Sequence, residues 1–297
     1  MKIYYGDINT KIDVTAICLY KLCNNNIITI PSGDSNRTYY FSDPLYGVLK
    51  KIYVILNENV TECNSNCLIK INLIDNVIIL TDNVDTTTDV KISNIQSKLK
   101  IKYGDFNEEL PEQKMAVKYL KGHEKVLEIG GNIGRNSLII ASILENNNFV
   151  TLECDSIIYN QLVENRDINN FTFNVENSAL SNRRLIQKGW DTIPSDILLE
   201  GFKWVNTITL DNLKAKYNIE FDTLVLDCEG AFYYILTDMP EILNNINLII
   251  MENDYHDINK KQYIDSVLIS NKFYREHSES GGWGPCYSNF FEVWKKL

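Results

Sequence analysis

Short apolar runs alternate with helix-like segments from Pro111 to the end of the chain, and this alternation restricts the fold more than any other feature. The runs are Val126–Ile129, Phe149–Glu153, Phe171–Val175, Thr223–Asp227 and Leu248–Glu252. Helical patterns lie between several of them, as in Asn136–Glu145 and Ile157–Asn165. Strands that alternate with helices form right-handed βαβ units. We therefore predict a doubly wound α/β domain with a mostly parallel sheet.

This predicted domain has a distinct segment at each end. The stretch PEQKMAVKYLKGHEK places Pro111 at a helix start and Gly122 near its stop, the usual position of each residue. Lys272–Ser278 and Ser288–Lys295 flank a glycine-rich turn and predict an antiparallel C-terminal hairpin. We assign residues 106–297 to this domain.

Residues 1–105 have a different sequence pattern, in which short β-type segments are separated by clusters of Asn, Asp, Ser and Gly. The segments are Ile27–Ile30, Lys51–Leu56, Leu68–Leu73 and Val77–Leu80. The polar cluster Ile30–Arg37 has the composition of a turn. We predict a smaller β-rich N-terminal domain. Its role stays open between dimerisation, acceptor binding and partner docking.

The composition bounds the class of protein. A hydrophobic content of 44% is enough for a folded core in 297 residues. The formal net charge of −10, without a dense basic run, disfavours nucleic acid as a partner. The sequence shows neither a secretory pattern nor an apolar run of membrane-spanning length. We expect a soluble, cytoplasmic protein without a membrane partner, and a homo-oligomer is compatible with the sequence.

The 7 cysteines form an odd set, which indicates reduced thiols rather than a disulfide framework. Cys18, Cys23, Cys63 and Cys67 offer a four-thiolate zinc site as an alternative, but their spacings are looser than those of a zinc knuckle. We predict that the cysteines are small buried hydrophobic residues.

The stretch VLEIGGNIGRNS breaks from an apolar run into glycines and then into a helical pattern. The first strand-to-helix turn of such a sheet presents backbone N–H groups to a ligand. A dinucleotide fingerprint needs glycines at the first, third and sixth places, and counted from either Gly130 or Gly131 it fails. The pattern present is Glu128-x-Gly130-x-x-x-Gly134.

This pattern resembles the first motif of class I S-adenosylmethionine-dependent methyltransferases. The glycines of that motif let the amino-acid part of the cofactor lie against the turn. The resemblance implies a cofactor site, with a purely structural turn as the alternative. Its residues are Glu128, Gly130, Gly131, Asn132 and Gly134.

Two later strand ends extend the expected cofactor site. Glu153 closes the second predicted strand, where a carboxylate can accept hydrogen bonds from both ribose hydroxyls. Ser178 and Ala179 follow the third strand, where such enzymes line the adenine. An ordinary strand-end turn is the alternative for these two residues.

Two further motifs resemble the FkbM family of methyltransferases. TITLDNL at Thr207–Leu213 and FDTLVLDCEGA at Phe221–Ala231 look like its paired TLD-x-L and D-x-E-G signatures. The resemblance covers about residues 111–255, although the turn reads EIGGN where the family more often has DVGAN. Members transfer a methyl group to a hydroxyl oxygen, often on a sugar or natural product. The resemblance implies an O-methyltransferase for a sugar, glycan, sugar nucleotide or related small molecule.

Methyl transfer to an unactivated hydroxyl benefits from a base. Asp227 and Glu229 close the fourth strand, and we place Asp227 closest to the methionine end of the cofactor. His256 follows the fifth strand, and histidine exchanges protons near neutral pH. These three are the candidate catalytic residues. Capping of the helix at Ala231–Leu236 by the carboxylates, and simple exposure of the histidine, are the structural alternatives.

The residues at the same strand ends offer a metal site as an alternative. Asp227, Glu252 and Asn253 offer oxygen ligands for Mg²⁺, which some methyltransferases use to ionise a hydroxyl. Sequence does not give the distances between them. We do not favour the metal.

Loops over the strand ends should form the acceptor pocket. Trp190 and Trp283 lie beside glycines, and an indole face suits the C–H face of a sugar, although packing is the more common role of tryptophan. Asp254 belongs to the loop over the same pocket. Asp211 precedes Asn212–Tyr217, where an aspartate normally caps a helix, so we predict a structural role for it.

Two other functions stay open. One is an RNA ribose methyltransferase, against which the negative charge counts. The other is a non-catalytic binding or assembly protein that keeps the methyltransferase fold as a scaffold while the β-rich domain does the work.

Overall fold

The chain divides into two units in the computed structural model. The N-terminal unit comprises Met1–Thr86 and the C-terminal unit Thr87–Leu297. The residues that the structure describes are 1–45, 48, 50–57, 59–65, 67–82 and 86–297.

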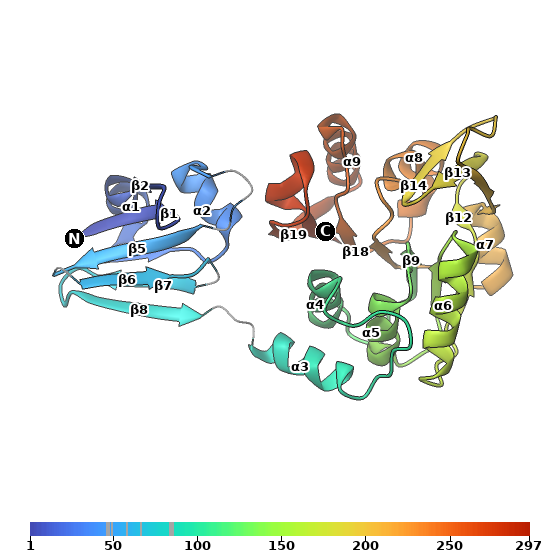
Figure 1. Ribbon diagram of the computed structural model, residues 1–297, viewed down its shortest axis with the longest axis horizontal. Coiled ribbons are helices and arrows are strands. Elements are labelled where there is room, and N and C mark those ends of the chain that lie inside the picture. The colour runs from blue at the N-terminus through green and yellow to red at the C-terminus, as the bar shows by residue number, and fades with distance from the viewer. Residues whose placement is uncertain (46–47, 49, 58, 66, 83–85) are drawn as a thin grey trace. The chain divides into compact units, whose positions relative to one another are not determined.

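The described part of the N-terminal unit contains sheets in the orders β2-β1-β5-β6 and β3-β4-β7-β8 (Figure 1). Neighbouring strands are antiparallel where their pairing is described. The strands are β1 (Lys2–Gly6), β2 (Lys11–Asp13), β3 (Cys23–Asn24), β4 (Ile27–Ile30), β5 (Lys51–Leu56), β6 (Asn59–Cys63), β7 (Cys67–Asn72) and β8 (Val77–Asp82). Ile3, Ile28, Ile52 and Ile69 are buried in one apolar core, as expected for strands with one covered face.

The N-terminal unit also contains helices α1 (Thr15–Lys21) and α2 (Asp34–Phe41). The polar cluster at 30–37, predicted as a turn, leads into α2. Arg37 is fully buried, and its guanidinium donates hydrogen bonds to three backbone carbonyl oxygens. Asp34 pairs with the buried Lys50 at 2.9 Å. The turn prediction was wrong for 34–37, where the chain is helical and the side chains of Asp34 and Arg37 are buried with partners elsewhere in the unit.

The C-terminal unit begins before the predicted boundary at residue 106. Helix α3 (Thr86–Gln96) and the loop after it belong to this unit. Ile92 lies in its apolar core, and Gln96 Nε2 donates to Gln113 Oε1 at 2.8 Å. This helix was not predicted from the sequence, because its threonines and other β-branched residues are typical of strands.

A seven-stranded sheet forms the centre of the C-terminal unit, in the order β11-β10-β9-β17-β18-β20-β19. Its strands are β9 (Val126–Ile129), β10 (Phe149–Leu152), β11 (Asn174–Glu176), β17 (Thr223–Leu226), β18 (Leu248–Glu252), β19 (Phe273–Glu279) and β20 (Phe291–Lys296). The strands from β11 to β18 are parallel, and β20 runs antiparallel to both of its neighbours. The predicted mostly parallel α/β sheet is confirmed.

Helices cover both faces of this sheet. Helix α4 packs against α5, and α8 packs against α9, on opposite sides of the strands (Figure 1). The helices are α4 (Leu110–Tyr119), α5 (Arg135–Ile143), α6 (Ser156–Asp167), α7 (Leu210–Tyr217), α8 (Phe232–Asp238) and α9 (Ile258–Ser270), with 3-10 turns η1 (Pro240–Leu243) and η2 (Gly284–Asn289). None of the helices in the described residues combines the length and apolar character needed to cross a membrane.

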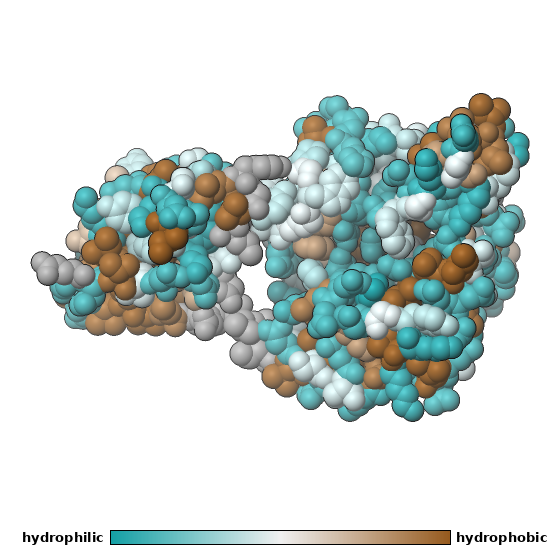
Figure 2. Space-filling view, viewed as in Figure 1, coloured by the Kyte–Doolittle hydropathy of each residue, from teal (hydrophilic) through white to brown (hydrophobic). Residues whose placement is uncertain are grey.

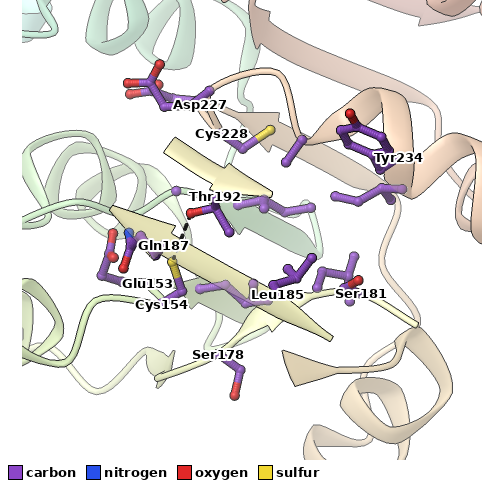
Figure 3. A pocket seen from close by; sticks show the side chains of 18 of the residues that line it. Glu153, Cys154, Ser178, Ser181, Leu185, Gln187, Thr192, Asp227, Cys228 and Tyr234 are labelled. Atoms are coloured by element: carbon purple, nitrogen blue, oxygen red, sulfur yellow. Dashed lines mark hydrogen bonds between the residues drawn. The ribbon is translucent and has the colours of Figure 1, made fainter. Parts of the chain in front are cut away.

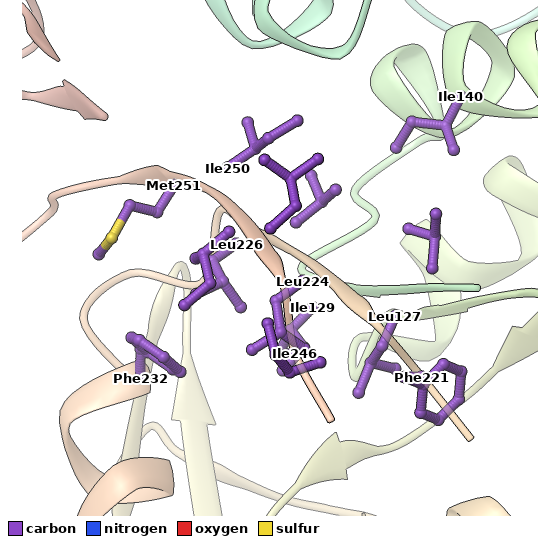
Figure 4. Packing of buried hydrophobic residues seen from close by; sticks show 14 of the residues in the cluster. Leu127, Ile129, Ile140, Phe221, Leu224, Leu226, Phe232, Ile246, Ile250 and Met251 are labelled. Atoms are coloured by element: carbon purple, nitrogen blue, oxygen red, sulfur yellow. The ribbon is translucent and has the colours of Figure 1, made fainter. Parts of the chain in front are cut away.

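The packing of the core explains why the sequences of the central strands are continuous apolar runs. Every residue of β9, β10 and β17 is buried, because helices cover the sheet on both faces. Figure 4 shows Leu224 and Leu226 on one side of the strands, the side of Phe232 of α8, and Ile250 on the other side, that of Ile140 of α5. This rigid layer fixes the positions of the strand ends.

Two small sheets lie between β11 and α7, in a segment for which no strands were predicted. β12 (Ala179–Leu180) pairs with β16 (Thr207–Ile208). β13 (Leu185–Lys188) pairs with both β14 (Asp191–Pro194) and β15 (Lys203–Val205). The signal was short: Leu185–Lys188 and Asp191–Pro194 are four-residue runs that flank the two-residue turn Gly189-Trp190, and a Gly-containing turn of this length is typical of a hairpin.

Helix α7 begins one residue after its cap, Thr209. The Thr209 hydroxyl accepts a hydrogen bond from the backbone N–H of Asn212 at 3.3 Å. Asp211 lies in the first turn instead, so its predicted role as the cap was wrong. An acidic residue there still interacts favourably with the positive end of the helix dipole.

The 7 cysteines, all among the described residues, carry thiols outside any disulfide. Cys18, Cys63, Cys67 and Cys286 are buried. Among the residues that the structure describes, no cluster of thiolates has the geometry to hold a metal.

Candidate functional site

A cavity opens at the edge of the sheet where the parallel strands end. Ligands of doubly wound sheets bind at this edge, because the loops there diverge. The cavity encloses about 950 Å³, part of it open to solvent, and is mainly apolar in its lining. The predicted site residues that line it are Gly130, Asn132, Glu153, Ser178, Ala179, Trp190, Asp227 and Glu229.

Figure 3 shows how the polar groups are distributed around this cavity. Asp227 and Cys228 lie at one end, Glu153 and Gln187 lie along one side, and Ser178 lies at the other end. The polar groups thus follow the order of the strand ends, β17, β10 and β11.

The glycine turn after β9 is held by close packing. Gly130 has φ +92, and a Cβ atom on it would lie 1.6 Å from the carbonyl oxygen of Asp227. A Cβ on Gly131 would lie 2.3 Å from Thr151 Oγ1. Gly134, with φ +92, is the N-cap of α5. Gly130 and Asn132 line the cavity, whereas Gly131 and Gly134 support the turn from behind.

Glu128 lies beneath the turn and does not line the cavity. It is 2% exposed, and its carboxyl accepts a hydrogen bond from the Ser137 hydroxyl. Burial raises the pKa of Glu128 to about 7, although that hydrogen bond favours the ionised form. Its observed contact ties β9 to the start of α5.

Glu153 is the polar centre of the cavity. Its two carboxylate oxygens accept the backbone N–H groups of Asn132, at 3.0 Å, and Asp155, at 2.7 Å. Burial raises the pKa of Glu153 to about 7, although these two hydrogen bonds favour its ionised form. A carboxylate has about four acceptor positions, so Glu153 keeps acceptor capacity for a ligand hydroxyl beside its hydrogen bonds to the backbone.

A wall of the cavity comes from the β13–β14 hairpin. Leu185, Gln187, Trp190, Thr192 and Pro194 all line the cavity. Sequence reasoning missed four of these five residues, because the hairpin itself was not predicted.

Apolar side chains are exposed at and beyond the tip of this hairpin. Trp190 is 60% exposed and Ile197 66%. Figure 2 shows brown surface over this segment, at the upper right beside β13 and β14. An exposed apolar group at the mouth of a cavity is typical of a binding surface.

Asp227 and Glu229 follow β17 and face the cavity. Helix α8 has Ala231 as its N-cap without a side-chain hydrogen bond, so neither carboxylate caps it. Burial, followed by the charges of Asp254 and Asp191, raises the pKa of Glu229 to about 7. Burial and the charges of neighbouring acids, Glu109 first, raise the pKa of Asp227 well above its usual value.

Three carboxylates, that of Asp227 included, converge beside the cavity. One oxygen from each of Glu112, Asp227 and Glu252 lies within 4.8 Å of the other two. Burial, the adjacent carboxyl of Glu112 and the charge of Asp227 raise the pKa of Glu252 far above its usual value. Such a group can hold a proton or a divalent cation, since both neutralise the mutual repulsion.

The structure brings Glu112 into this cluster. Asn253, the third residue of the predicted metal site, is fully buried, and its Nδ2 donates to the carbonyl oxygen of Asn289 at 2.7 Å. Glu112 was not singled out because an acid in the first turn of a helix usually serves the helix itself.

His256, Trp283 and Asp254 do not line the cavity. The rings of His256 and Trp283 are in contact, with centroids 4.3 Å apart and planes tilted by 43°, and both side chains are exposed. Asp254 is 6% exposed, and burial raises its pKa to about 6. These three residues form a neighbouring group on the loops that follow β18 and β19.

Comparisons with known proteins give weak matches, to solved structures alone. No model of a known protein family matches the chain, and no curated protein matches it. Among solved structures, an O-methyltransferase from Bacillus cereus in complex with SAH has a TM-score of 0.41 and 16% identity, over 71% of this chain and 91% of that one.

Two other solved structures give similar values. A ribosomal protein L11 methylase from Lactobacillus delbrueckii subsp. bulgaricus has a TM-score of 0.41 and 11% identity, over 63% of this chain and 78% of that one. An rRNA methylase from Streptococcus thermophilus has a TM-score of 0.39 and 11% identity, over 62% and 93%. At such identities no residue role is transferred from these proteins to this chain.

Proposed function

We propose that the C-terminal unit binds S-adenosylmethionine and transfers its methyl group to a hydroxyl of a sugar, glycan, sugar nucleotide or related small molecule, as an FkbM-like O-methyltransferase. The observation that carries this proposal is the cavity at the strand ends. Gly130, Glu153, Ser178 and Asp227 line it in the order that the sequence motifs imply.

The residues present fit a nucleoside with a charged tail. Leu180, Leu185, Ile235 and Met239 give the cavity apolar surface for a base, and Glu153 keeps acceptor positions for a sugar diol. The buried Oε1 of Gln187 has no hydrogen-bond partner among the described residues. A ligand that carries hydroxyl groups would complete these contacts.

When bound, S-adenosylmethionine supplies a methyl group activated by a sulfonium. The task of the chain is to hold the acceptor hydroxyl in line and to accept its proton. Glu229 suits the second task, since it faces the cavity and its pKa of about 7 allows proton exchange near neutral pH. Trp190 offers an exposed indole face to the acceptor at the cavity mouth.

Titration calorimetry of the full chain with S-adenosylmethionine and S-adenosylhomocysteine tests the first half of the proposal. Micromolar binding of both is the expected result. A folded chain that binds neither would defeat the proposal. Turnover is then measured on a panel of sugars, sugar nucleotides and RNA. Binding without turnover on any of them would favour a non-catalytic role.

A Glu153→Gln variant is expected to bind S-adenosylhomocysteine about 10- to 100-fold more weakly at pH 8, because hydrogen bonds to a charged acceptor contribute about 1.5–3 kcal/mol. The ionised carboxylate accepts from both hydroxyls, so wild-type affinity should fall as the pH drops below about 7, the pKa of Glu153. The affinity of Glu153→Gln should not fall in this way as the pH drops.

Calorimetry between pH 5.5 and 8.5 measures both effects. Glu164→Gln is the matched control, because it removes the same charge from an exposed site on α6. Equal pH profiles for wild type and Glu153→Gln would show that Glu153 does not bind the ligand.

A further inference from the structure

Gln187 shares a face of the β13–β14 hairpin with three other cavity residues. In the antiparallel register Gln187 lies opposite Thr192, and Leu185 lies opposite Pro194. Side chains alternate along a strand, so these four point to the same side, into the cavity. Ile186, between Leu185 and Gln187, is fully buried and does not line the cavity.

The side-chain amide of Gln187 is buried, and its oxygen receives no hydrogen bond from the described residues. The residue is 5% exposed, and its Oε1 has no hydrogen-bond partner in the part of the chain that the structure describes. A buried polar atom without a partner costs about 1–3 kcal/mol. A donor from a ligand in the cavity would remove this cost.

The hairpin spans the cavity from the end of β10 toward the end of β17. Thr192, the cross-strand neighbour of Gln187, has its hydroxyl 3.9 Å from Cys154 Sγ, and Cys154 follows Glu153. At the tip, the charge of Asp191 acts on Glu229. Figure 3 shows Gln187 beside Glu153 and Cys154, whereas Leu185 lies farther along the cavity.

We propose that Gln187 accepts a hydrogen bond from a ribose hydroxyl of the bound nucleoside, beside Glu153, so that the β13–β14 hairpin contacts the sugar. This inference rests on the proposed function, because the nucleoside is that of S-adenosylmethionine. A vicinal diol offers two O–H donors. Glu153 and Gln187 supply neighbouring acceptors for these donors, while Leu185 and Pro194 leave apolar surface for the base.

The test uses the full chain and titration calorimetry with S-adenosylhomocysteine and its 2′-deoxy and 3′-deoxy analogues. Gln187→Met keeps the length of the side chain and removes the amide. The expected loss of S-adenosylhomocysteine affinity is about 3- to 10-fold, the range of one neutral hydrogen bond. One of the deoxy analogues should bind wild type and Gln187→Met equally. Lys188→Met, at the exposed next position of β13, is the matched control and should bind like wild type.

Three results would overturn the inference. Unchanged affinity of Gln187→Met for S-adenosylhomocysteine removes Gln187 from the site while leaving the proposed function intact. A loss that persists with both deoxy analogues but disappears with S-inosylhomocysteine assigns the amide to the base instead of the sugar. Absence of binding by folded wild type removes the proposed function and this inference together. Wild type alone also tests the sugar contact, since one deoxy analogue must bind it more weakly than the parent compound.

Discussion

A Gly130→Ala substitution is expected to lower the free energy of unfolding of the C-terminal unit by at least about 3 kcal/mol. The backbone of Gly130 has φ +92, and the added Cβ would lie 1.6 Å from the carbonyl oxygen of Asp227. Neither strand end can easily move. Gly130 N–H donates to Leu152 at 3.0 Å, and Asp227 N–H donates to Ile129 at 3.1 Å.

Urea denaturation followed by tryptophan fluorescence measures this loss, because the 4 tryptophans all lie in the C-terminal unit. Gly189→Ala is the matched control. Gly189 also has a positive φ, +58, but a Cβ there would meet no atom within 4 Å. Its expected cost is about 1 kcal/mol, from the left-handed backbone alone. Equal losses in the two variants would show that the contact with Asp227 is not what requires glycine at position 130.

The same geometry changes what the glycine motif means. The sequence motif implies that Gly130 serves a cofactor, yet the contact with Asp227 requires glycine even without one. Loss of ligand binding in a Gly130 variant would therefore not separate function from folding. Glu153 and Gln187 are better probes of ligand binding. Their side chains face the cavity, and neither residue lies at the close contact between the ends of β9 and β17.

The central strands of the sheet were predictable because they are buried on both faces, whereas the edge strand β11 (Asn174–Glu176) begins three residues after the start of the predicted run Phe171–Val175. β9 and β18 have the bounds that their apolar runs predict, and β10 and β17 differ by one residue. Continuous burial gives a continuous apolar run, which is visible in one sequence without any tertiary information. The strand ends, and hence Glu153 and Asp227, followed directly.

The hairpin wall and the acid cluster were not predictable in the same way. β13 and β14 have only four residues each, and the residues that face the cavity are as different as Leu185, Gln187 and Pro194. Glu112 and Glu252 come from a helix and a strand that meet only in the folded chain. Local periodicity carries no information on which residues of different elements come together, so Glu112 was not predicted.

A Glu252→Gln variant is expected to be more stable than wild type at pH 8, by about 2 kcal/mol as an order of magnitude. Burial, Glu112 and Asp227 raise the pKa of Glu252 in the folded chain far above its usual value. Between the ordinary glutamate pKa and that raised value, the folded state holds a proton that the unfolded state releases. Stability therefore falls as the pH rises through this window, and glutamine removes the dependence because it does not titrate.

Urea denaturation at pH 5, 6.5 and 8 measures the difference between the two curves, which should widen with pH. Glu220→Gln is the matched control, because Glu220 is exposed and its pKa is lowered by its ion pair with Lys214. That variant should gain no stability at pH 8. A constant difference between Glu252→Gln and wild type across the pH range would contradict the repulsion argument.

Millimolar Mg²⁺ distinguishes a proton from a metal as the partner of this cluster. A cation held by Glu112, Asp227 and Glu252 needs ionised carboxylates, so its stabilising effect must grow with pH, opposite to the effect of the proton. Stabilisation of wild type at pH 8 that is absent at pH 5 and in Glu252→Gln would assign a metal site to the cluster. Equal urea denaturation curves with and without Mg²⁺ would exclude a bound cation. A shared proton would then be the positive charge that lets the carboxyl groups of Glu112, Asp227 and Glu252 lie side by side.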